Sequence, residues 1–174
     1  MSEEHNYDLV IVGGGPAGSS AAFSAAKNGI KVALIEKENS IAETVRTSGV
    51  TWIESIKEFG IPENCYNPIK NFSFVSPNNE VTITDSIATA AVLDVRKTYR
   101  WLANEAKKCG VDIFLKTNIS EVIKNEKNDI VGVSGTGISG KIIFHSKVII
   151  DATGFTSVIS KAMGFVTQLS LIHI

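Results

Sequence analysis

The sequence has few cysteines, no long apolar run and no excess of charge of either sign. Its two cysteines, Cys65 and Cys109, lie far apart without a CxxC spacing or partner histidines, which argues against a disulfide framework and a zinc site. No apolar run approaches the roughly 18 residues that a membrane span needs. Glu3 and Glu4 stand where a secretory signal carries basic residues. We therefore expect a cytoplasmic protein without a bound metal ion.

The lack of net charge also narrows the choice of partners. The 17 Lys and Arg residues are balanced by 18 Asp and Glu residues, and the formal net charge is -1. Such a chain has no long-range field to attract nucleic acid, so we expect no nucleic-acid partner. What the chain does have is 44% hydrophobic residues in a length of 174, enough for one packed core and about one domain.

Glycine and alanine are concentrated near the start, in YDLVIVGGGPAGSSAAFSAAKNGIKVALIEKE. Residues 8–12 form a run that is apolar and largely β-branched after Asp8, which predicts a strand buried on both faces. Pro16 suits the first turn of a helix, and we predict a helix over residues 17–28 that ends at Gly29. Residues 31–35 predict a second buried strand. Together these elements predict a βαβ unit with parallel strands and a right-handed crossover.

The glycines between strand and helix match a dinucleotide-binding motif. In the spacing G-x-G-x-x-G, Gly13 allows a tight turn, Gly15 lets a pyrophosphate approach the main chain, and Gly18 lets helix and strand pack closely. The helix start supplies free N–H groups and a favourable dipole for the phosphates. Glu36, at the end of the second strand, can accept both ribose hydroxyls and would repel a 2′-phosphate. The motif thus predicts FAD or NAD, while Gly14 fills an x position where Ala or Ser would serve as well.

The remainder of the chain favours FAD over NAD. The predicted elements are a short helix in 48–61, a β-hairpin over 69–84, an amphipathic helix over 94–110, a third parallel strand at 111–116, three short strands over 119–146 and a buried strand within 147–154. An NAD domain would instead continue with alternating βα units. A third parallel strand, then an antiparallel meander, then a strand ending in DATG is the layout of FAD-binding oxidoreductases.

At this point the chain resembles a known family, the geranylgeranyl reductases, within a larger group of flavoproteins that includes p-hydroxybenzoate hydroxylase-like monooxygenases. The resemblance rests on GGGPAG with IEK, on VRTSG, on LDVRKTYRWLANEAKKCGVDIFLKTNI and on IIDATGFTSVISKAMG, and it runs from about Tyr7 to about Gly164. It implies an α/β fold: an FAD-binding, Rossmann-like βαβ domain with a parallel sheet plus an antiparallel β-meander, and a partial second, β-rich substrate domain.

The same resemblance implies how the chain divides. Residues 1–168 would form an incomplete FAD/NAD(P)-binding domain, from which an excursion of about residues 50–92 carries a β-hairpin that belongs to the substrate domain. In the family, further chain supplies most of the substrate-binding sheet and a second flavin motif. Residues 169–174, LSLIHI, resemble the translation of a sequencing adapter. We therefore predict that they are a non-native tail and that the 174-residue chain alone is an inactive, N-terminal part of an enzyme.

Carried over position by position, the resemblance implies which residues contact FAD. Ala17 would lie against the pyrophosphate, Glu36 would hold the adenosine ribose, and the main chain of Ile119 would contact adenine. Arg96, at the start of the helix after the excursion, would contact FAD as well. The resemblance names no catalytic residue within these 174 positions.

A loop and a strand end complete the implied site. Residues 46–49 fall where the family has an Arg-Cys-x-x-Gly loop near the flavin. Thr47 replaces that cysteine and the loop is one residue shorter, so no thiol role carries over. At the end of the last strand, the Asp-Gly type motif approaches the cofactor. The full predicted set is Gly13, Gly15, Ala17, Gly18, Glu36, Arg46, Thr47, Ser48, Gly49, Arg96, Ile119, Asp151 and Gly154.

Plainer interpretations remain open for several of these residues. Arg96 could be a solvated arginine, although a cation in the first helical turn opposes the helix dipole and calls for a partner. Asp151 could cap the turn that follows it, and Arg46 could be an ordinary loop charge. We interpret Trp52, at a helical position, as a packing residue, and we place His5 in a flexible terminus.

The resemblance implies an FAD-dependent oxidoreductase of lipid biosynthesis that reduces C=C bonds of geranylgeranyl chains in isoprenoid lipid precursors. Its partners would be a prenyl-chain lipid, an electron donor such as NAD(P)H or ferredoxin, and the membrane surface, in peripheral contact. Two related alternatives are an aromatic-type FAD monooxygenase and an electron-transfer flavoprotein dehydrogenase-like enzyme. An alternative of another class is a non-catalytic, truncated dinucleotide-binding fragment.

Overall fold

A computed structural model describes residues 2–165. The chain divides into two compact units, and each is described by itself below. The first unit holds the described residues up to Glu43 and from Tyr99 on, and the second is Thr44–Thr98. The boundary between Thr98 and Tyr99 falls inside helix α3 (Val95–Lys108). The predicted tail at 169–174 lies outside the described residues.

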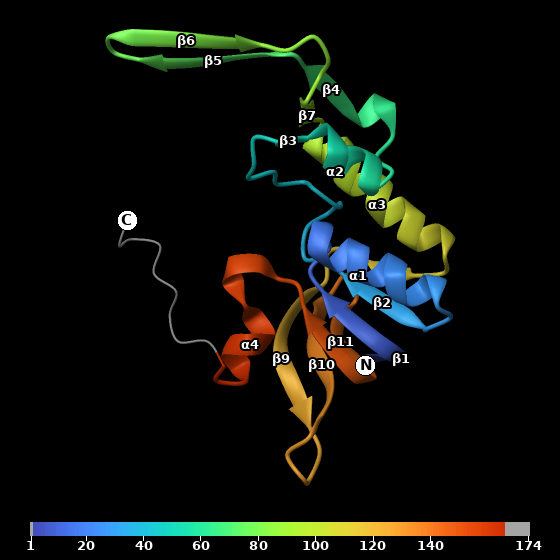
Figure 1. Ribbon diagram of the computed structural model, residues 1–174. Coiled ribbons are helices and arrows are strands. Elements are labelled where there is room, and N and C mark those ends of the chain that lie inside the picture. Colours follow the sequence, from blue (N-terminus) through green and yellow to red (C-terminus); the bar gives the residue numbers. More distant parts are fainter. Residues whose placement is uncertain (1, 166–174) are drawn as a thin grey trace. The chain divides into compact units, whose positions relative to one another are not determined.

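The first unit is built on one sheet that is parallel at one side and antiparallel at the other (Figure 1). Within the described residues its strand order is β8-β2-β1-β11-β10-β9. The strands are β1 (Glu3–Val12), β2 (Val32–Ile35), β8 (Asp112–Phe114), β9 (Asn118–Lys124), β10 (Ile130–Gly137) and β11 (Gly140–Asp151). The pairs β1–β2, β2–β8 and β1–β11 are parallel, whereas β9, β10 and β11 form an antiparallel meander. The predicted parallel sheet with a meander is thus confirmed.

Strand β1, helix α1 (Pro16–Lys27) and strand β2 form the predicted βαβ unit. The strand begins at Glu3, earlier than predicted, because its first residues pair with β11. His5 therefore lies in a paired strand, with its ring centroid 4.9 Å from that of Phe114 and 5.3 Å from that of Phe144. The prediction of a flexible terminus around His5 is wrong, because the strand partner that orders it comes far later in the sequence.

Strand β11 joins two strands that the sequence analysis separated. Residues 140–145 pair with β10 in antiparallel register, and residues 142–151 run parallel to β1. The polar residues 145–147 interrupt the apolar pattern, which led to the prediction of a break. In the structure one strand runs through them, with His145 and Ser146 paired to β1, and β11 belongs to both halves of the sheet.

The core of the first unit lies on both faces of the parallel strands. On one face, α1 and the later part of α3 pack with the odd positions of β1; the buried members are Leu9, Ile11, Ala22, Ala26, Val32, Leu34, Ala106 and Val111. On the other face, the meander and helix α4 (Val158–Ala162) cover the even positions; the buried members are Val10, Val12, Ala33, Ile35, Ile119, Val133, Ile142, Phe144 and Ile159. Figure 1 shows α4 beside β9. The nucleotide-motif strand is therefore buried on both sides.

The second unit contains an antiparallel sheet of order β3-β7-β4 and a separate two-stranded ribbon, β5–β6 (Figure 1). Its elements are β3 (Val50–Trp52), α2 (Ile53–Glu58), the 3-10 turn η1 (Glu63–Cys65), β4 (Tyr66–Ile69), β5 (Asn71–Ser76), β6 (Asn79–Thr84), β7 (Ala90–Leu93) and the first turn of α3. The ribbon is the predicted hairpin. Trp52 ends β3 and leaves 63% of its surface exposed, so its predicted packing role is wrong.

Candidate dinucleotide-binding site

The glycine turn between β1 and α1 is shaped by contact with the end of β11. Gly13 has a φ of 111°, which side chains rarely tolerate. A Cβ on Gly13 would collide with the carbonyl oxygen of Ala152 and lie 3.0 Å from the nitrogen of Thr153. A Cβ on Gly18 would collide with the carbonyl oxygen of Gly13 and lie 3.2 Å from the Cβ of Ala152. At both positions, therefore, contacts within the chain itself exclude a side chain.

Gly15 is different, because nothing in the described chain requires it to be glycine. It is the N-cap of α1, its φ of -69° is accessible to any residue, and a Cβ there would have no neighbour within 4 Å among residues 2–165. No side chain of that part of the chain caps the helix, and in its first turn Ala17 is exposed whereas Gly18 is buried. The positive end of a helix with free N–H groups favours an anion. The site therefore fits a pyrophosphate.

Glu36 lies directly after β2 and is held next to the glycine turn. Its Oε2 accepts a hydrogen bond of 2.8 Å from the N–H of Gly14, and its Oε1 accepts one of 3.0 Å from the N–H of Glu38. These two bonds fix the carboxylate without using all of its lone pairs. A carboxylate fixed beside the phosphate-facing turn is placed to accept the hydroxyls of a ribose.

Gly14 proves to have a role that the motif did not reveal. A Cβ at this position would collide with Cδ1 of Ile41 and would lie 3.1 Å from both Cβ and Oε2 of Glu36. The expectation that Ala or Ser would serve there is wrong. The signal was present in the sequence: parallel pairing of β1 with β2 places the residue after β2 beside the residues after β1.

The turn between β8 and β9 lies against the same strand end. The N–H of Glu36 donates to the oxygen of Phe114 (2.8 Å), and the N–H of Thr117 donates to the oxygen of Glu36 (3.0 Å). Ile119, two residues further on, is the second residue of β9. It is only 4% exposed and packs in the core. The first unit thus brings the predicted adenine-contacting segment to the edge of the sheet where Glu36 lies.

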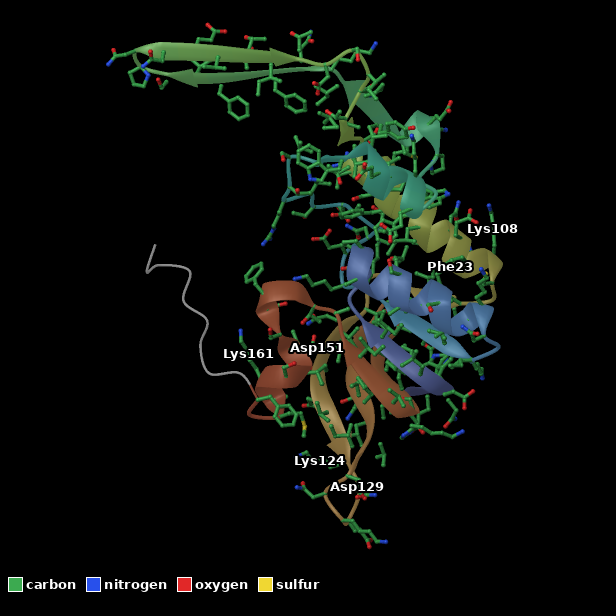
Figure 2. The ribbon with its side chains drawn as sticks, in the orientation of Figure 1. Phe23, Lys108, Lys124, Asp129, Asp151 and Lys161 are labelled. Atoms are coloured by element: carbon green, nitrogen blue, oxygen red, sulfur yellow. The ribbon has the colours of Figure 1, made fainter. Side chains whose placement is uncertain are left out.

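Asp151, the last residue of β11, uses its carboxylate within the chain. Its Oδ1 accepts bonds from the N–H (3.1 Å) and hydroxyl (2.6 Å) of Thr153, and its Oδ2 from the N–H (2.8 Å) and hydroxyl (2.9 Å) of Ser160. Burial acts to raise the pKa of Asp151, but these hydrogen bonds outweigh it and hold the pKa below its usual value. Figure 2 shows Asp151 between the strand end and α4, whereas Lys161 points outward. Gly154 follows with a φ of 66°.

The remaining predicted residues belong to the second unit. Arg46, Thr47 and Ser48 are exposed on a loop, and Arg96 is exposed in the first turn of α3. Gly49 is buried with a φ of 77°, and a Cβ there would lie 2.8 Å from the oxygen of Leu93. The N–H of Leu93 also donates to the oxygen of Gly49 (2.9 Å). The loop is therefore anchored to the strand that leads into α3.

Sequence reasoning missed the cap of α3. The N–H of Lys97 donates to Oδ1 of Asp94 (3.0 Å), which fixes the first turn of the helix. An aspartate three residues before a backbone N–H at a predicted helix start is a recognisable capping signal. The cap orients the turn that carries Arg96.

Two further observations concern groups that could have had other roles. Cys65 is 2% exposed, and burial raises the pKa of its thiol. Among residues 2–165, no three His, Cys, Asp or Glu side chains are grouped in a way that could hold a metal ion. In the same range, no helix combines the length and the apolar character needed to cross a bilayer.

Comparison with known proteins gives consistent matches. Residues 8–165 match the family described as FAD dependent oxidoreductase. The chain is 36% identical over 162 residues to a digeranylgeranylglycerophospholipid reductase of Methanocaldococcus jannaschii, which covers 91% of this chain and 40% of that protein. It is 31% identical to an uncharacterised protein encoded in the 5′ region of nifH2 in Methanosarcina barkeri, covering 94% of this chain and 91% of that protein.

Among solved structures, the chain superposes on a geranylgeranyl bacteriochlorophyll reductase-like protein of Thermoplasma acidophilum with a TM-score of 0.83 and 27% identity. The match covers 95% of this chain and 44% of that one. The chain thus spans about 40% of the length of the reductases that it matches. These matches confirm the predicted resemblance to geranylgeranyl reductases and the predicted fold.

Proposed function

Because the chain belongs to the family of FAD-dependent oxidoreductases, we propose that it forms the FAD-binding part of a flavoenzyme that reduces C=C bonds in the geranylgeranyl chains of isoprenoid lipid precursors. The family confirms FAD as the predicted cofactor and oxidoreductase as the predicted class of enzyme. The substrate class is supported by relatives that are named as digeranylgeranylglycerophospholipid reductases.

The open space at Gly15, in front of the uncapped start of α1, is the observation that carries the proposal. The N–H groups of Ala17 and Gly18 would bind the pyrophosphate, and Glu36 would accept the ribose hydroxyls. Because Gly14 already holds Glu36 by a 2.8 Å hydrogen bond, the carboxylate would lose little freedom when the cofactor binds. When bound, FAD supplies the redox chemistry, and the chain supplies binding and orientation.

Other residues enter the proposal through the resemblance. Residues 46–49 and Arg96 would contribute further contacts to FAD, as would the main chain of Ile119 and the turn that contains Gly154. The anchoring of Gly49 to Leu93 and the cap on α3 support this role, because both hold these residues in fixed local conformations. Arginines are suited to such contacts because the guanidinium group keeps its charge at all physiological pH values.

Cofactor binding can be tested with two matched substitutions. Gly15→Ala and Gly137→Ala both add a methyl group without steric conflict in the protein, since the added Cβ meets nothing at position 15 and only ordinary contacts of 3.5 Å or more at position 137. We expect the 174-residue chain to bind FAD, measured by quenching of flavin fluorescence. Gly15→Ala should weaken binding by roughly tenfold or more, because its methyl group occupies the approach of the pyrophosphate. Equal affinity of the two variants would refute the site.

The substrate class needs a complete enzyme. Residues 1–165 can replace the corresponding part of the Methanocaldococcus relative, whose own remaining chain supplies the rest. With reduced flavin and a digeranylgeranyl lipid, the chimera should give a product whose mass rises by two hydrogen atoms for each double bond reduced. A chimera that binds FAD but hydroxylates aromatic compounds, and leaves the lipid unchanged, would favour the monooxygenase alternative.

The electron donor and the cellular location of the enzyme are further parts of the proposed function. Anaerobic mixing of the FAD-loaded chimera with NADH, NADPH or reduced ferredoxin identifies the donor by bleaching of the flavin absorbance. We propose that the enzyme is cytoplasmic, as the sequence analysis predicts, and a lipid substrate favours peripheral contact with a membrane. Co-sedimentation with lipid vesicles measures that contact, and complete recovery in the supernatant would contradict it.

A further inference from the structure

The turn that follows β11 is fixed at two points by side-chain hydrogen bonds. Asp151 accepts four of them, two from Thr153 and two from Ser160. The hydroxyl of Thr153 also accepts a hydrogen bond of 2.9 Å from the N–H of Val158, the first residue of α4. These bonds form a clamp, defined here as Asp151, Thr153 and Ser160, between the strand end and the helix.

The helix at the other end of this clamp is itself fixed in the core. Ile159, next to Ser160, is 6% exposed and packs in the core cluster that contains Val10 and Val12 of β1. The hydrogen bonds from Ser160 to Asp151 therefore connect the end of β11 to a helix that is anchored in the core. The clamp thus holds the strand end in place against α4.

Ala152 lies between Asp151 and Thr153 in the sequence and packs closely against the glycine turn. Its N–H donates to the oxygen of Val12 (2.8 Å). Its carbonyl group occupies the space that a Cβ on Gly13 would need, and its methyl group lies 3.2 Å from the place of a Cβ on Gly18. The path of the chain through Ala152 thus sets how closely Gly13 and Gly18 approach each other at the start of α1.

We infer that Asp151 is a positioning residue for the dinucleotide loop, acting through Ala152 on Gly13 and Gly18 and not through direct contact with the cofactor. A carboxylate has about four lone-pair sites, and Thr153 and Ser160 use all of them. A shift of the Ala152 backbone would tilt the N–H groups at the start of α1 away from the pyrophosphate. This inference rests on the proposed function, which it extends to the residue that shapes the phosphate-facing turn.

The test compares variants of the 174-residue chain by two measurements. One is the FAD dissociation constant, and the other is amide hydrogen exchange of the FAD-free protein at residues 13–19. Asp151→Asn replaces one acceptor oxygen by a donor, so we expect faster exchange at residues 13–19 and a roughly ten- to hundredfold weaker affinity. Asp8→Asn is the matched control, because Asp8 lies on β1 and pairs with Lys147 outside the clamp.

Position 153 provides an independent pair of variants if Asp151→Asn fails to fold. Thr153→Val keeps the shape but removes the hydroxyl, and it should change exchange and affinity in the same direction as Asp151→Asn. Thr153→Ser keeps the hydroxyl and should restore both toward wild type. Equal behaviour of the valine and serine variants would overturn the inference.

Two further outcomes separate positioning from general loss of stability and from failure of the proposed function. If the exchange of the β9 and β10 amides rises as much as that of residues 13–19, or if neither rises, the inference is wrong. If the wild-type chain itself binds no FAD, the proposed function fails. The exchange measurement still decides whether Asp151 holds the glycine turn.

Discussion

Gly14 shows how residues that follow a neighbouring strand can exclude one methyl group. Gly14→Ala would force Ile41 to move and would crowd Glu36. We expect a loss of about 1–3 kcal/mol in the free energy of unfolding, the usual cost of overpacking. Urea denaturation measures this loss, with Gly137→Ala as the control that meets only ordinary contacts.

The same clash predicts a coupling between two positions. Ile41→Val removes the Cδ1 atom that the new methyl group would strike. The double variant Gly14→Ala/Ile41→Val should therefore lose less stability than the sum of the two single variants. Strict additivity would show that the methyl group at position 14 is accommodated in another way.

Asp151 should make stability depend on pH in the acid range. Its pKa is lower in the folded chain than the value of about 3.9 for an unfolded aspartate. The stability that it contributes is therefore present above about pH 4 and is lost as the pH falls through the lower, folded pKa. Asp151→Asn lacks this titration, so the stability gap between wild type and variant should narrow in urea denaturation series from pH 6 to pH 2. A constant gap would contradict this.

At the scale of elements, β11 is the strand on which both halves of the first sheet depend. Phe144 on this strand is fully buried, with its ring centroid 4.8 Å from that of Phe114 in an edge-to-face arrangement. We expect Phe144→Ala to cost about 3–5 kcal/mol, a large part of the total stability of a domain. Ile138→Ala, at a site 80% exposed at the meander turn, should change stability little. Thermal denaturation compares the two, and similar midpoints would be inconsistent with this core.

The elements that could be predicted from the sequence are those whose pattern is local. The βαβ unit has its strand, turn and helix signals within about thirty residues, and the hairpin has alternating residues around a turn. The continuity of β11 across residues 145–147 and the ordering of His5 depend on the β1–β11 pairing, which no local pattern encodes.

The residues of the candidate site also divide into those with a local sequence signal and those without one. The glycine spacing and Glu36 could be predicted because the motif has a fixed spacing. The pairing of β1 with β2 indicates that Glu36 lies beside Gly14, but the contact of Gly14 with Ile41 and the clamp around Asp151 could not be predicted, because Ile41 and Ser160 come from other segments. The capping alternative for Asp151 identified the right chemistry but not the connection through Ala152 to the glycine turn.

At the scale of the whole molecule, the β5–β6 ribbon is a two-stranded sheet separate from the other sheets. Phe72 faces Ile83 and Phe74 faces Val81 across its two strands. Phe74, Val81 and Ile83 are each about half exposed or more. An exposed apolar ribbon whose outer edges pair with no other strand in residues 2–165 favours self-association. We expect this chain to associate at high concentration through that face.

The substitution pair Phe74→Thr and Val81→Thr tests this expectation. Together they should shift the onset of association, measured by light scattering, to higher protein concentration without lowering the thermal midpoint of the first unit. Ile138→Thr removes an equally exposed but isolated side chain and should leave the onset unchanged. If the ribbon variant associates as readily as wild type, another surface is responsible.

The pairing of β1 with β11 also determines when the protein can mature during synthesis. Asp8 and Lys147, which pair across these strands, are separated by 139 residues. A ribosome therefore releases β1 long before its main partner, and until then β2 is the neighbour available to it. The nascent chain carries an open strand edge throughout this interval, when mispairing is most damaging. Since Ala152 completes the glycine turn, cofactor capture must wait until the ribosome has released β11 and the turn that follows it.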